Sequence, residues 1–363
     1  MNILFVSEYF YPKLAGGEIW SSDLCRGLIK KGHKITVITS RYNKNLKKKE
    51  IIGGIKVLRI AQTGEIIKRI NFAIRLFLFL NKLLNKEKFD VVHSMSYVAS
   101  VPASWIAKRY KISSITSVHS YFGRDWFKFE NLVKARFNYL IERVILKLDR
   151  SDVIHVPSKH LANLISKIKP NVKIIPNFIV KENMDKLDKT EIIKIKTELK
   201  IKPDTKLLIF IGSLTKIKNI LNLVKIIKIP EGFHLLIVGE GSLRKEIIKV
   251  IKERNLEDKI TLLKSKDHLA TMRYLQLSSV LINPSISESF GLTVIEALYF
   301  NKLVISTNVG IVKELNEGNI IKINSLEEIN ELLQNNIKKS KIKQFDETFL
   351  VDNVIEKFED IYT

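Results

Sequence analysis

Two carboxylates eight residues apart, Glu288 and Glu296, frame the stretch whose residue types could do chemistry. A buried-looking run, SSVLINPS, leads into a short polar loop, and from Leu292 apolar residues recur at helix spacing. The stretch 285–297 is therefore predicted to form a strand, a tight loop and a helix. Such a loop points backbone N–H groups and the positive end of a helix at one place, a natural seat for phosphate. Gly291 would let a ligand approach the backbone closely.

The separation of these two carboxylates argues against the acid/base pair of a glycoside hydrolase. Eight residues of helix separate them by about 12 Å, whereas hydrolase carboxylates lie roughly 5 to 9.5 Å apart. Two clamps on different parts of one elongated ligand fit this separation better. A carboxylate at a helix N-terminus and another on a solvated helix face would explain the same residues without any ligand. The pair alone therefore does not establish a ligand-binding site.

The motif Glu-x-Phe-Gly-x(4)-Glu, placed after a Pro-Ser strand end, resembles the donor-binding motif of glycosyltransferase family 4, retaining enzymes of the GT-B fold. The resemblance implies that Glu288 contacts hydroxyls of the donor sugar and belongs to the catalytic residues. It implies that Glu296 binds the nucleotide ribose. The backbone that would face the sugar and the diphosphate belongs to Phe290, Gly291 and Leu292.

Apolar strands alternate with amphipathic helices along the chain, which predicts an α/β fold. The first strand covers 3–6, and a loop with the pair Gly16-Gly17 separates it from a helix over 18–31. Ligands of open α/β sheets bind beyond the carboxyl ends of strands. In family 4 a glycine pair here approaches the donor phosphates or the acceptor, and YPKLAGGE resembles that pattern. A tight turn would explain the two glycines equally well.

Two further strands that look buried end in His-Ser, at His93 and at His119. A histidine in such a place is often only capped by the backbone, and we expect a structural role for His93. His119 is followed by a long loop rich in aromatic residues, 121–126. It resembles the family's loop histidine, which lies beside the reacting sugar, so the resemblance implies a catalytic role.

A second α/β series begins near Leu207. Its first loop, GSLTKIK, resembles the family's Gly-Arg-Leu-x-x-x-Lys, whose two cations neutralise the donor diphosphate. Lys218 matches the lysine, whereas Ser213 stands at the arginine position, and a point charge does not replace a planar two-pronged cation. The next strand ends at Gly239 in VGEG, similar to the family's Val-Gly-x-Gly. The loop 264–268 lies where the family holds the base.

These elements predict a GT-B fold, in which two Rossmann-like parallel-sheet domains face each other across a cleft. The N-terminal acceptor domain would span 1–178 and take back a C-terminal helix, 346–363. The nucleotide-sugar donor domain would span 179–345. The family's usual Gly-Gly late in this domain reads Gly310-Ile311 here, and the effect of the change is open.

Composition sets outer limits on what the protein does. The 363 residues suffice for two domains, and 45% apolar residues argue against disorder. One cysteine, Cys25, excludes an intramolecular disulfide framework and fits a buried thiol in a cytoplasmic protein. The N-terminus lacks the basic region of a signal peptide. For the net charge of +23, lysine-rich coding bias or an anionic membrane explains more than nucleic acid, since no zinc-finger spacing or RNP-type strand is present.

The most apolar part of the chain is 70–84. Its longest unbroken apolar run, 76–80, is far shorter than the roughly 20 residues that span a bilayer. We favour a helix packed on the sheet. The alternative is an interfacial helix whose basic residues meet anionic head groups.

The function expected from the resemblance is retaining transfer of a sugar from a nucleotide sugar to an acceptor hydroxyl. The acceptor would be a glycan or a lipid-linked molecule, as in synthesis of cell-surface polysaccharide or glycolipid. The enzyme would work in the cytoplasm, peripherally on the inner face of the membrane. No Asp-x-Asp motif is present, consistent with the metal independence that the resemblance to GT-B enzymes implies. No cofactor is expected. Two other classes stay open: a GT-B epimerase or phosphorylase, and a non-catalytic protein that binds sugar nucleotides or membrane surfaces.

Overall fold

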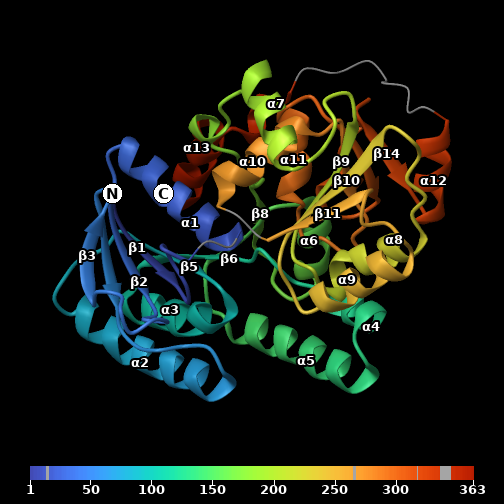
Figure 1. Ribbon diagram of the computed structural model, residues 1–363. Coiled ribbons are helices and arrows are strands. Elements are labelled where there is room, and N and C mark those ends of the chain that lie inside the picture. Colours follow the sequence, from blue (N-terminus) through green and yellow to red (C-terminus); the bar gives the residue numbers. More distant parts are fainter. Residues whose placement is uncertain (14–15, 265–266, 317, 336–344) are drawn as a thin grey trace. The chain divides into compact units, whose positions relative to one another are not determined.

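The computed structural model describes residues 1–13, 16–264, 267–316, 318–335 and 345–363. The chain divides into two compact units. The first unit comprises Met1–Phe178 with Thr348–Thr363, and the second comprises Ile179–Glu347. In each unit, helices surround a central sheet (Figure 1). The predicted α/β class is confirmed, and the cleft predicted between the domains stays a prediction.

The first unit is built on an eight-stranded sheet with the order β3-β4-β2-β1-β5-β6-β7-β8. Its strands are β1 (Asn2–Ser7), β2 (Lys34–Thr39), β3 (Lys49–Ile52), β4 (Ile55–Arg59), β5 (Val91–Met95), β6 (Ser113–Ser117), β7 (Val153–Val156) and β8 (Val172–Ile174). Only the β3–β4 pair in this sheet is antiparallel. Every residue of β5 is buried, as expected for a central parallel strand covered on both faces.

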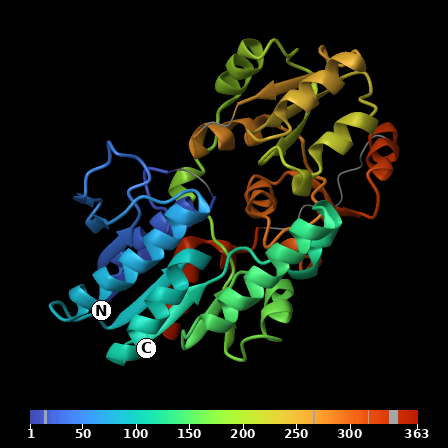
Figure 2. The ribbon, with the colours of Figure 1, turned by 90° about the horizontal axis from the view of Figure 1, so that it is seen from below.

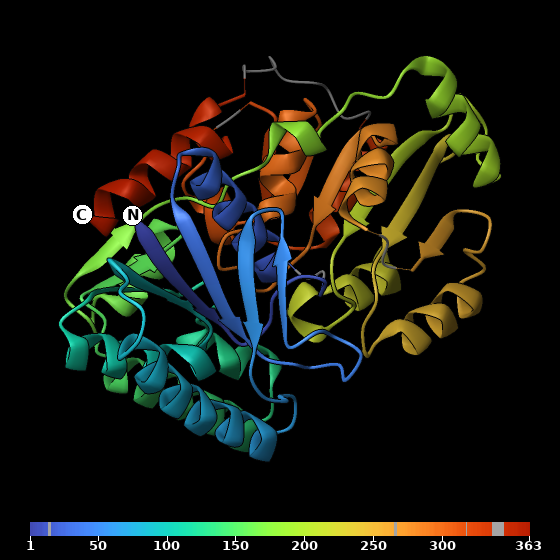
Figure 3. The same ribbon diagram turned by 90° about the vertical axis from the view of Figure 1, so that its left-hand side faces the viewer.

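Helices cover both faces of this sheet. The helices of the first unit are α1 (Gly16–Lys30), α2 (Ile66–Leu84), α3 (Tyr97–Tyr110), α4 (Trp126–Phe129), α5 (Leu132–Leu148), α6 (Lys159–Ile165) and α13 (Val351–Tyr362). Figures 1 and 3 show α1 on one face and α2 and α3 on the other. Right-handed crossovers explain this, because the β1-to-β2 and β5-to-β6 connections run in opposite directions across the sheet.

Two predictions about buried elements of this unit are confirmed. The stretch 70–84 belongs to α2, and its inward side chains Phe72, Leu76 and Leu80 are fully buried in an apolar cluster with α3. Cys25 is fully buried, and burial raises the pKa of its thiol. Within the described ranges, no helix is both long and apolar enough to cross a bilayer.

The last helix, α13, packs against α1 through a buried aromatic cluster. Phe358 is fully buried. Its ring centroid lies 5.7 Å from those of Trp20 and His93 and 4.8 Å from that of His155. The end of the chain therefore completes the core of the first unit.

A chain of buried hydrogen bonds ties the same helix to three neighbouring strands. His155 Nε2 lies 2.8 Å from the Ile175 carbonyl, which can only accept, so this nitrogen donates. His155 Nδ1 then accepts from Ser117 Oγ at 2.7 Å, and Ser117 accepts from His93 Nε2 at 2.6 Å. His93 Nδ1 accepts from the Tyr362 hydroxyl at 2.6 Å. His93 is thus bonded to side chains and not to the backbone, and all five groups are satisfied only while both rings are neutral.

The second unit is built on a fully parallel six-stranded sheet with the order β11-β10-β9-β12-β13-β14. Its strands are β9 (Lys206–Ile211), β10 (Phe233–Val238), β11 (Ile260–Leu263), β12 (Val280–Asn283), β13 (Leu303–Thr307) and β14 (Ile320–Ile323). Counted from β9, this order reads 3-2-1-4-5-6, that of the Rossmann fold. Ligands of such sheets bind where the order reverses, here between β9 and β12.

Helices and short 3-10 turns connect these strands around one apolar core. They are η2 (Lys181–Asn183), α7 (Lys189–Glu198), η3 (Lys216–Lys218), α8 (Ile220–Ile226), α9 (Arg244–Glu253), α10 (His268–Leu277), α11 (Leu292–Tyr299), η4 (Gly310–Lys313) and α12 (Glu327–Gln334). The predicted strand–loop–helix at 285–297 corresponds to the end of β12, a loop, and α11.

We expect Phe358→Ala to lower the free energy of unfolding of the first unit by about 3–5 kcal/mol, because it empties a closed aromatic site. All three tryptophans, at 20, 105 and 126, lie in this unit, so tryptophan fluorescence in a denaturant titration reports its unfolding. Asp360→Ala, an exposed change on the same helix, is the matched control. Equal stability of the two variants would show that α13 is not part of the core.

We expect the first unit to lose stability as the pH falls from 7 to 5. Burial lowers the pKa of His155 from 6.5 to about 4, and that of His93 well below 6.5. Between the folded-state pKa and the unfolded-state pKa of each histidine, the unfolded chain binds more protons than the folded unit. Each histidine therefore lowers the free energy of unfolding by up to about 1.4 kcal/mol for each pH unit of acidification in that range. Tryptophan fluorescence should show the unfolding midpoint moving to lower denaturant. A denaturant midpoint that rises on acidification would contradict the presence of buried, neutral His93 and His155 in the folded unit.

Candidate active site

The first unit contains a cavity of about 360 Å³ at the carboxyl ends of its central strands. It lies where the strand order reverses, between β1 and β5. Its lining includes Gly17 at the start of α1, Tyr97 at the start of α3, and His119 in the loop after β6. Gly16 is exposed beside it, and positions 14 and 15 of the predicted glycine loop lie outside the described residues.

His119 lies at the wall of this cavity against an aromatic neighbour. Its ring centroid is 4.1 Å from that of Trp20 and 5.7 Å from that of His155. Burial, and next the neighbouring His155, lower the pKa of His119 to about 3, although Asn177 opposes the shift. Its Nε2 is buried and makes no hydrogen bond of good geometry to the part of the chain that the structure describes. A neutral ring with a free nitrogen can exchange a hydrogen bond with a sugar hydroxyl.

The loop that carries His119 is fixed by a glutamate that the sequence analysis missed. Glu142 of α5 is 5% exposed and accepts from the backbone N–H groups of Phe122, at 3.3 Å, and Gly123, at 3.0 Å. Burial raises the pKa of Glu142, and these two hydrogen bonds oppose the increase. Tyr97 adds a hydrogen bond from its hydroxyl to the Ser120 carbonyl. The available signal was that Glu142 is the one acid in a helix with four basic residues.

In the second unit, the loops after β9 and β12 meet through an ion pair. Lys218 Nζ contacts Glu288 Oε1, and both side chains are largely buried. Ser285 Oγ lies 2.8 Å from the same oxygen and 2.7 Å from Asn283 Oδ1, so its one proton is shared between two acceptors that lie beside each other. Ser213 is exposed, and its hydroxyl lies 3.3 Å from that of Thr215 and not against the ion pair. The structure therefore brings Lys218 and Glu288 together and leaves Ser213 apart.

Glu296 lies inside α11 and is only 3% exposed. Its Oε1 is 2.7 Å from His268 Nε2, at the start of α10, a partner that the sequence analysis did not identify. Gly291 precedes α11 in a left-handed conformation with φ +95°, and Leu292 is the first helical residue. Within the predicted base-binding loop, positions 265 and 266 lie outside the described residues.

Two glycines are explained by close backbone packing. Gly310 has φ +52°, and a Cβ there would lie 2.3 Å from the carbonyl oxygen of Phe290. Its neighbour Ile311 is buried and donates its N–H to the same carbonyl at 2.7 Å, so the departure from Gly-Gly leaves this contact intact. A Cβ on Gly239 would lie 1.9 Å from the Gly212 carbonyl oxygen. Glycine at 239 is thus required by strand packing whether or not a donor binds.

The predicted residues form one set in each unit. Gly17 and His119 share the first-unit cavity. The second-unit set surrounds the carboxyl ends of β9 and β12. It combines the Lys218 cation, two carboxylates and the N-terminus of α11. Such groups can bind the phosphates and the hydroxyls of one ligand. Among the described residues, no group of three or more His, Cys, Asp or Glu side chains is placed to hold a metal ion.

Two family models match the chain in succession. Residues 14–183 match the model described as Glycosyltransferase Family 4, and residues 191–347 match the model described as Glycosyl transferases group 1. Together they cover nearly all of both units.

Known proteins agree with this match. The chain is 26% identical over 325 residues to the phosphatidylinositol N-acetylglucosaminyltransferase GPI3 subunit of Saccharomyces cerevisiae, covering 86% of this chain and 69% of that protein. It is 26% identical over 320 residues to the N-acetyl-alpha-D-glucosaminyl L-malate synthase of Bacillus anthracis, covering 84% and 79%. The solved sucrose-phosphate synthase of Thermosynechococcus elongatus superposes with a TM-score of 0.78 at 18% identity, covering 100% and 95%, which shows the shared GT-B fold. The chain therefore belongs to glycosyltransferase family 4 and is a nucleotide-sugar-dependent glycosyltransferase.

Proposed function

We propose that this enzyme transfers N-acetylglucosamine from a nucleoside diphosphate sugar to a hydroxyl of a lipid-linked acceptor, with retention of configuration. The transfer would take place at the cytoplasmic face of a membrane. The main support is the Lys218–Glu288 ion pair at the strand-order reversal of the second sheet, where Glu288 belongs to the motif that resembles the family's donor motif. The names of the yeast and Bacillus relatives both specify an N-acetylglucosaminyl group. The yeast name specifies phosphatidylinositol, which supports a lipid acceptor.

The chemical step requires, above all, stabilisation of the leaving diphosphate. The bond from the sugar C1 to the phosphate oxygen breaks, a bond to the acceptor oxygen forms on the same face, and the acceptor proton passes to the leaving phosphate. Negative charge grows on the diphosphate, so fixed positive groups there lower the barrier. Lys218 and the N–H groups at the start of α11 supply such groups, and we expect turnover without added metal.

Donor binding redistributes the contacts of the ion pair. Lys218 turns toward the diphosphate, and Glu288 then accepts hydrogen bonds from sugar hydroxyls while Ser285 keeps it oriented. Glu296 binds the ribose diol, and His268 orients its carboxylate. In the first unit, the neutral His119 exchanges a hydrogen bond with the reacting sugar or the acceptor. We place the acceptor near Gly16-Gly17.

A small hydroxy acid is the second candidate acceptor, because the Bacillus relative is named for L-malate. The two acceptors separate in one assay: a thermal-shift panel of uridine, guanosine and adenosine diphosphate sugars selects the donor, and labelled donor is then offered with phosphatidylinositol micelles or with L-malate. Label in the lipid phase supports the proposal, and label on malate replaces it with the second candidate. Conversion of donor without any acceptor would instead indicate an epimerase.

We expect Glu296→Ala and Glu288→Ala to separate nucleotide binding from turnover. Loss of hydrogen bonds to a charged group costs about 1.5–3 kcal/mol, so Glu296→Ala should weaken binding of free nucleoside diphosphate by roughly 10- to 100-fold. Glu288→Ala should lower kcat while leaving nucleotide affinity unchanged or tighter, because it releases Lys218 to the phosphates.

Isothermal titration calorimetry and steady-state kinetics measure these two effects. The control is Glu257→Ala, which removes an exposed carboxylate of the same unit. Equal loss of nucleotide affinity in the Glu288 and Glu296 variants would refute the separate roles assigned to the two carboxylates.

We expect His119→Ala to lower kcat by about 100-fold or more with little change in nucleotide affinity. Because the pKa of His119 is about 3, the ring stays neutral from pH 5 to 8 and its protonation should add no step to the kcat profile over that range. Thermal stability is measured in parallel. If the variant loses activity only in proportion to a loss of folded protein, His119 anchors its loop and has no direct role in transfer.

A further inference from the structure

Helix α5 presents a continuous apolar stripe to solvent. Its buried side is narrow, with Ala135, Glu142 and Leu146. Apolar residues that are 40% to 81% exposed recur every three or four positions along the rest of the helix, which aligns them on one side. They are Leu132, Val133, Phe137, Leu140, Ile141, Val144 and Leu148.

Helix α2 carries a second exposed stripe beside its buried one. Its outward apolar residues are 57% to 82% exposed: Ile66, Ile67, Ile70, Ile74 and Leu78. α2 packs against α3, and α3 packs against α5. Figure 2 shows the three helices on the same side of the first sheet. We call the two exposed stripes together the α2–α5 face.

The charges around this face are predominantly positive. α2 contains Lys68, Arg69, Arg75 and Lys82 and no acidic residue. α5 contains Lys134, Arg136, Arg143 and Lys147, and its one acid, Glu142, is buried. Glu65 and Glu130, just before the two helices, pair with Lys68 and Lys134. Arg69 also pairs with the buried Glu8, whose Oε1 lies 2.9 Å from its Nε. The solvent side of both helices is otherwise apolar and basic.

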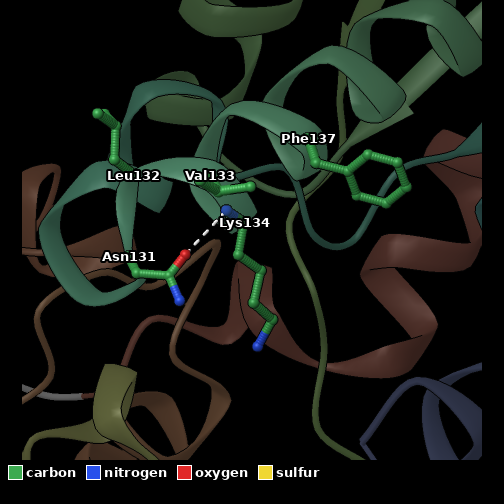
Figure 4. A pocket seen from close by; sticks show the side chains of 5 residues that line it. All are labelled: Asn131, Leu132, Val133, Lys134 and Phe137. Atoms are coloured by element: carbon green, nitrogen blue, oxygen red, sulfur yellow. Dashed lines mark hydrogen bonds between the residues drawn. The ribbon is translucent and has the colours of Figure 1, made fainter.

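The start of α5 adds a hollow to the α2–α5 face. Asn131 caps the helix by accepting from the N–H of Lys134 at 3.0 Å. Leu132 and Phe137 extend to either side of Val133 around the hollow, while the Lys134 side chain points away from Leu132 (Figure 4). An apolar hollow of this kind suits an acyl chain.

We propose that the α2–α5 face docks on an anionic membrane surface. Its aliphatic side chains would enter the boundary between head groups and acyl chains, and its basic side chains would contact anionic head groups. A protein partner fits less well, because protein interfaces favour aromatic anchors and are depleted in lysine, whereas this face is mainly Ile, Leu and Val ringed by Lys and Arg. Exposed apolar stripes of this extent are unusual on a free monomer.

The same helix links the docking face to the first-unit cavity. The inward Glu142 of α5 binds the loop of Phe122 and Gly123, and that loop carries His119. Docking through α5 would therefore bring the cavity to the surface where a lipid-linked acceptor resides. The link to a lipid-linked acceptor rests on the proposed function. Membrane binding itself can be measured without donor or acceptor, so membrane docking and the proposed sugar transfer can fail independently.

The test is co-sedimentation of the full-length protein with phosphatidylcholine vesicles, with and without phosphatidylglycerol, over a salt series. We expect binding that requires the anionic lipid and weakens with salt. The combined variant Val133→Ser, Phe137→Ser and Val144→Ser should bind at least about tenfold more weakly, because the burial of even one of these apolar side chains contributes about one tenfold factor or more. Arg136→Gln with Lys147→Gln should reduce the dependence on phosphatidylglycerol.

Matched controls replace apolar residues that are equally exposed elsewhere. Ile51→Ser on β3, at 76% exposure, and Ile193→Ser on α7, at 52%, should bind as the unmodified protein does. Near-ultraviolet circular dichroism verifies that each variant is folded. Three outcomes would overturn the proposal: binding that ignores lipid charge, undiminished binding by the folded stripe variant, or a dimer in sedimentation velocity that only the stripe variant abolishes, since a second copy would then cover the face.

Discussion

The reversal of strand order in each parallel sheet is the constraint on which the site depends. Beyond a reversal, the connecting loops diverge to opposite faces and leave room for a ligand at the carboxyl ends of the strands. In the first unit the reversal between β1 and β5 opens the cavity lined by Gly17 and His119. In the second unit the reversal between β9 and β12 places Lys218 against Glu288. Within each set, the residues are far apart in sequence and come together because of this strand connectivity.

Opposite charges keep the second-unit site ordered before a donor arrives. Lys218, at the end of η3, and Glu288, after β12, neutralise each other, and Ser285 holds the carboxylate. A diphosphate would compete for the lysine and release the carboxylate for sugar hydroxyls, so one ion pair would serve two parts of the donor in turn. Ser213 is exposed at the position where the family pattern has arginine, so in the proposed mechanism Lys218 would neutralise more of the diphosphate charge than in that pattern.

Much of the fold could be predicted from the sequence, because buried parallel strands and the loops after them have strong local patterns. The strand–loop–helix at 285–297 and the GT-B fold class followed from these patterns and the family resemblance. The β3–β4 hairpin was missed because its short strands lie at the sheet edge and follow a lysine-rich segment. Helix α3 was missed because it is buried on several sides and contains Pro102, which weakens its periodic signal.

Partners that lie far apart in sequence could not be predicted from local patterns. Glu296 was identified from its motif, whereas its neighbour His268 comes from another helix, 28 positions away. The exposure of the α5 stripe was missed for a related reason. Apolar residues at helix spacing look the same whether they face a core or solvent, and only the tertiary structure distinguishes the two.

Proton NMR of the anomeric signals during turnover can follow sugar transfer with retention from a nucleotide donor. The full-length protein is incubated with the N-acetylglucosamine donor that stabilises it most and with phosphatidylinositol in micelles. We expect the donor's anomeric signal to be replaced by a product signal of the same configuration, with one nucleoside diphosphate released per sugar transferred. A product of inverted configuration, or an altered donor sugar that stays attached to its nucleotide, would contradict it.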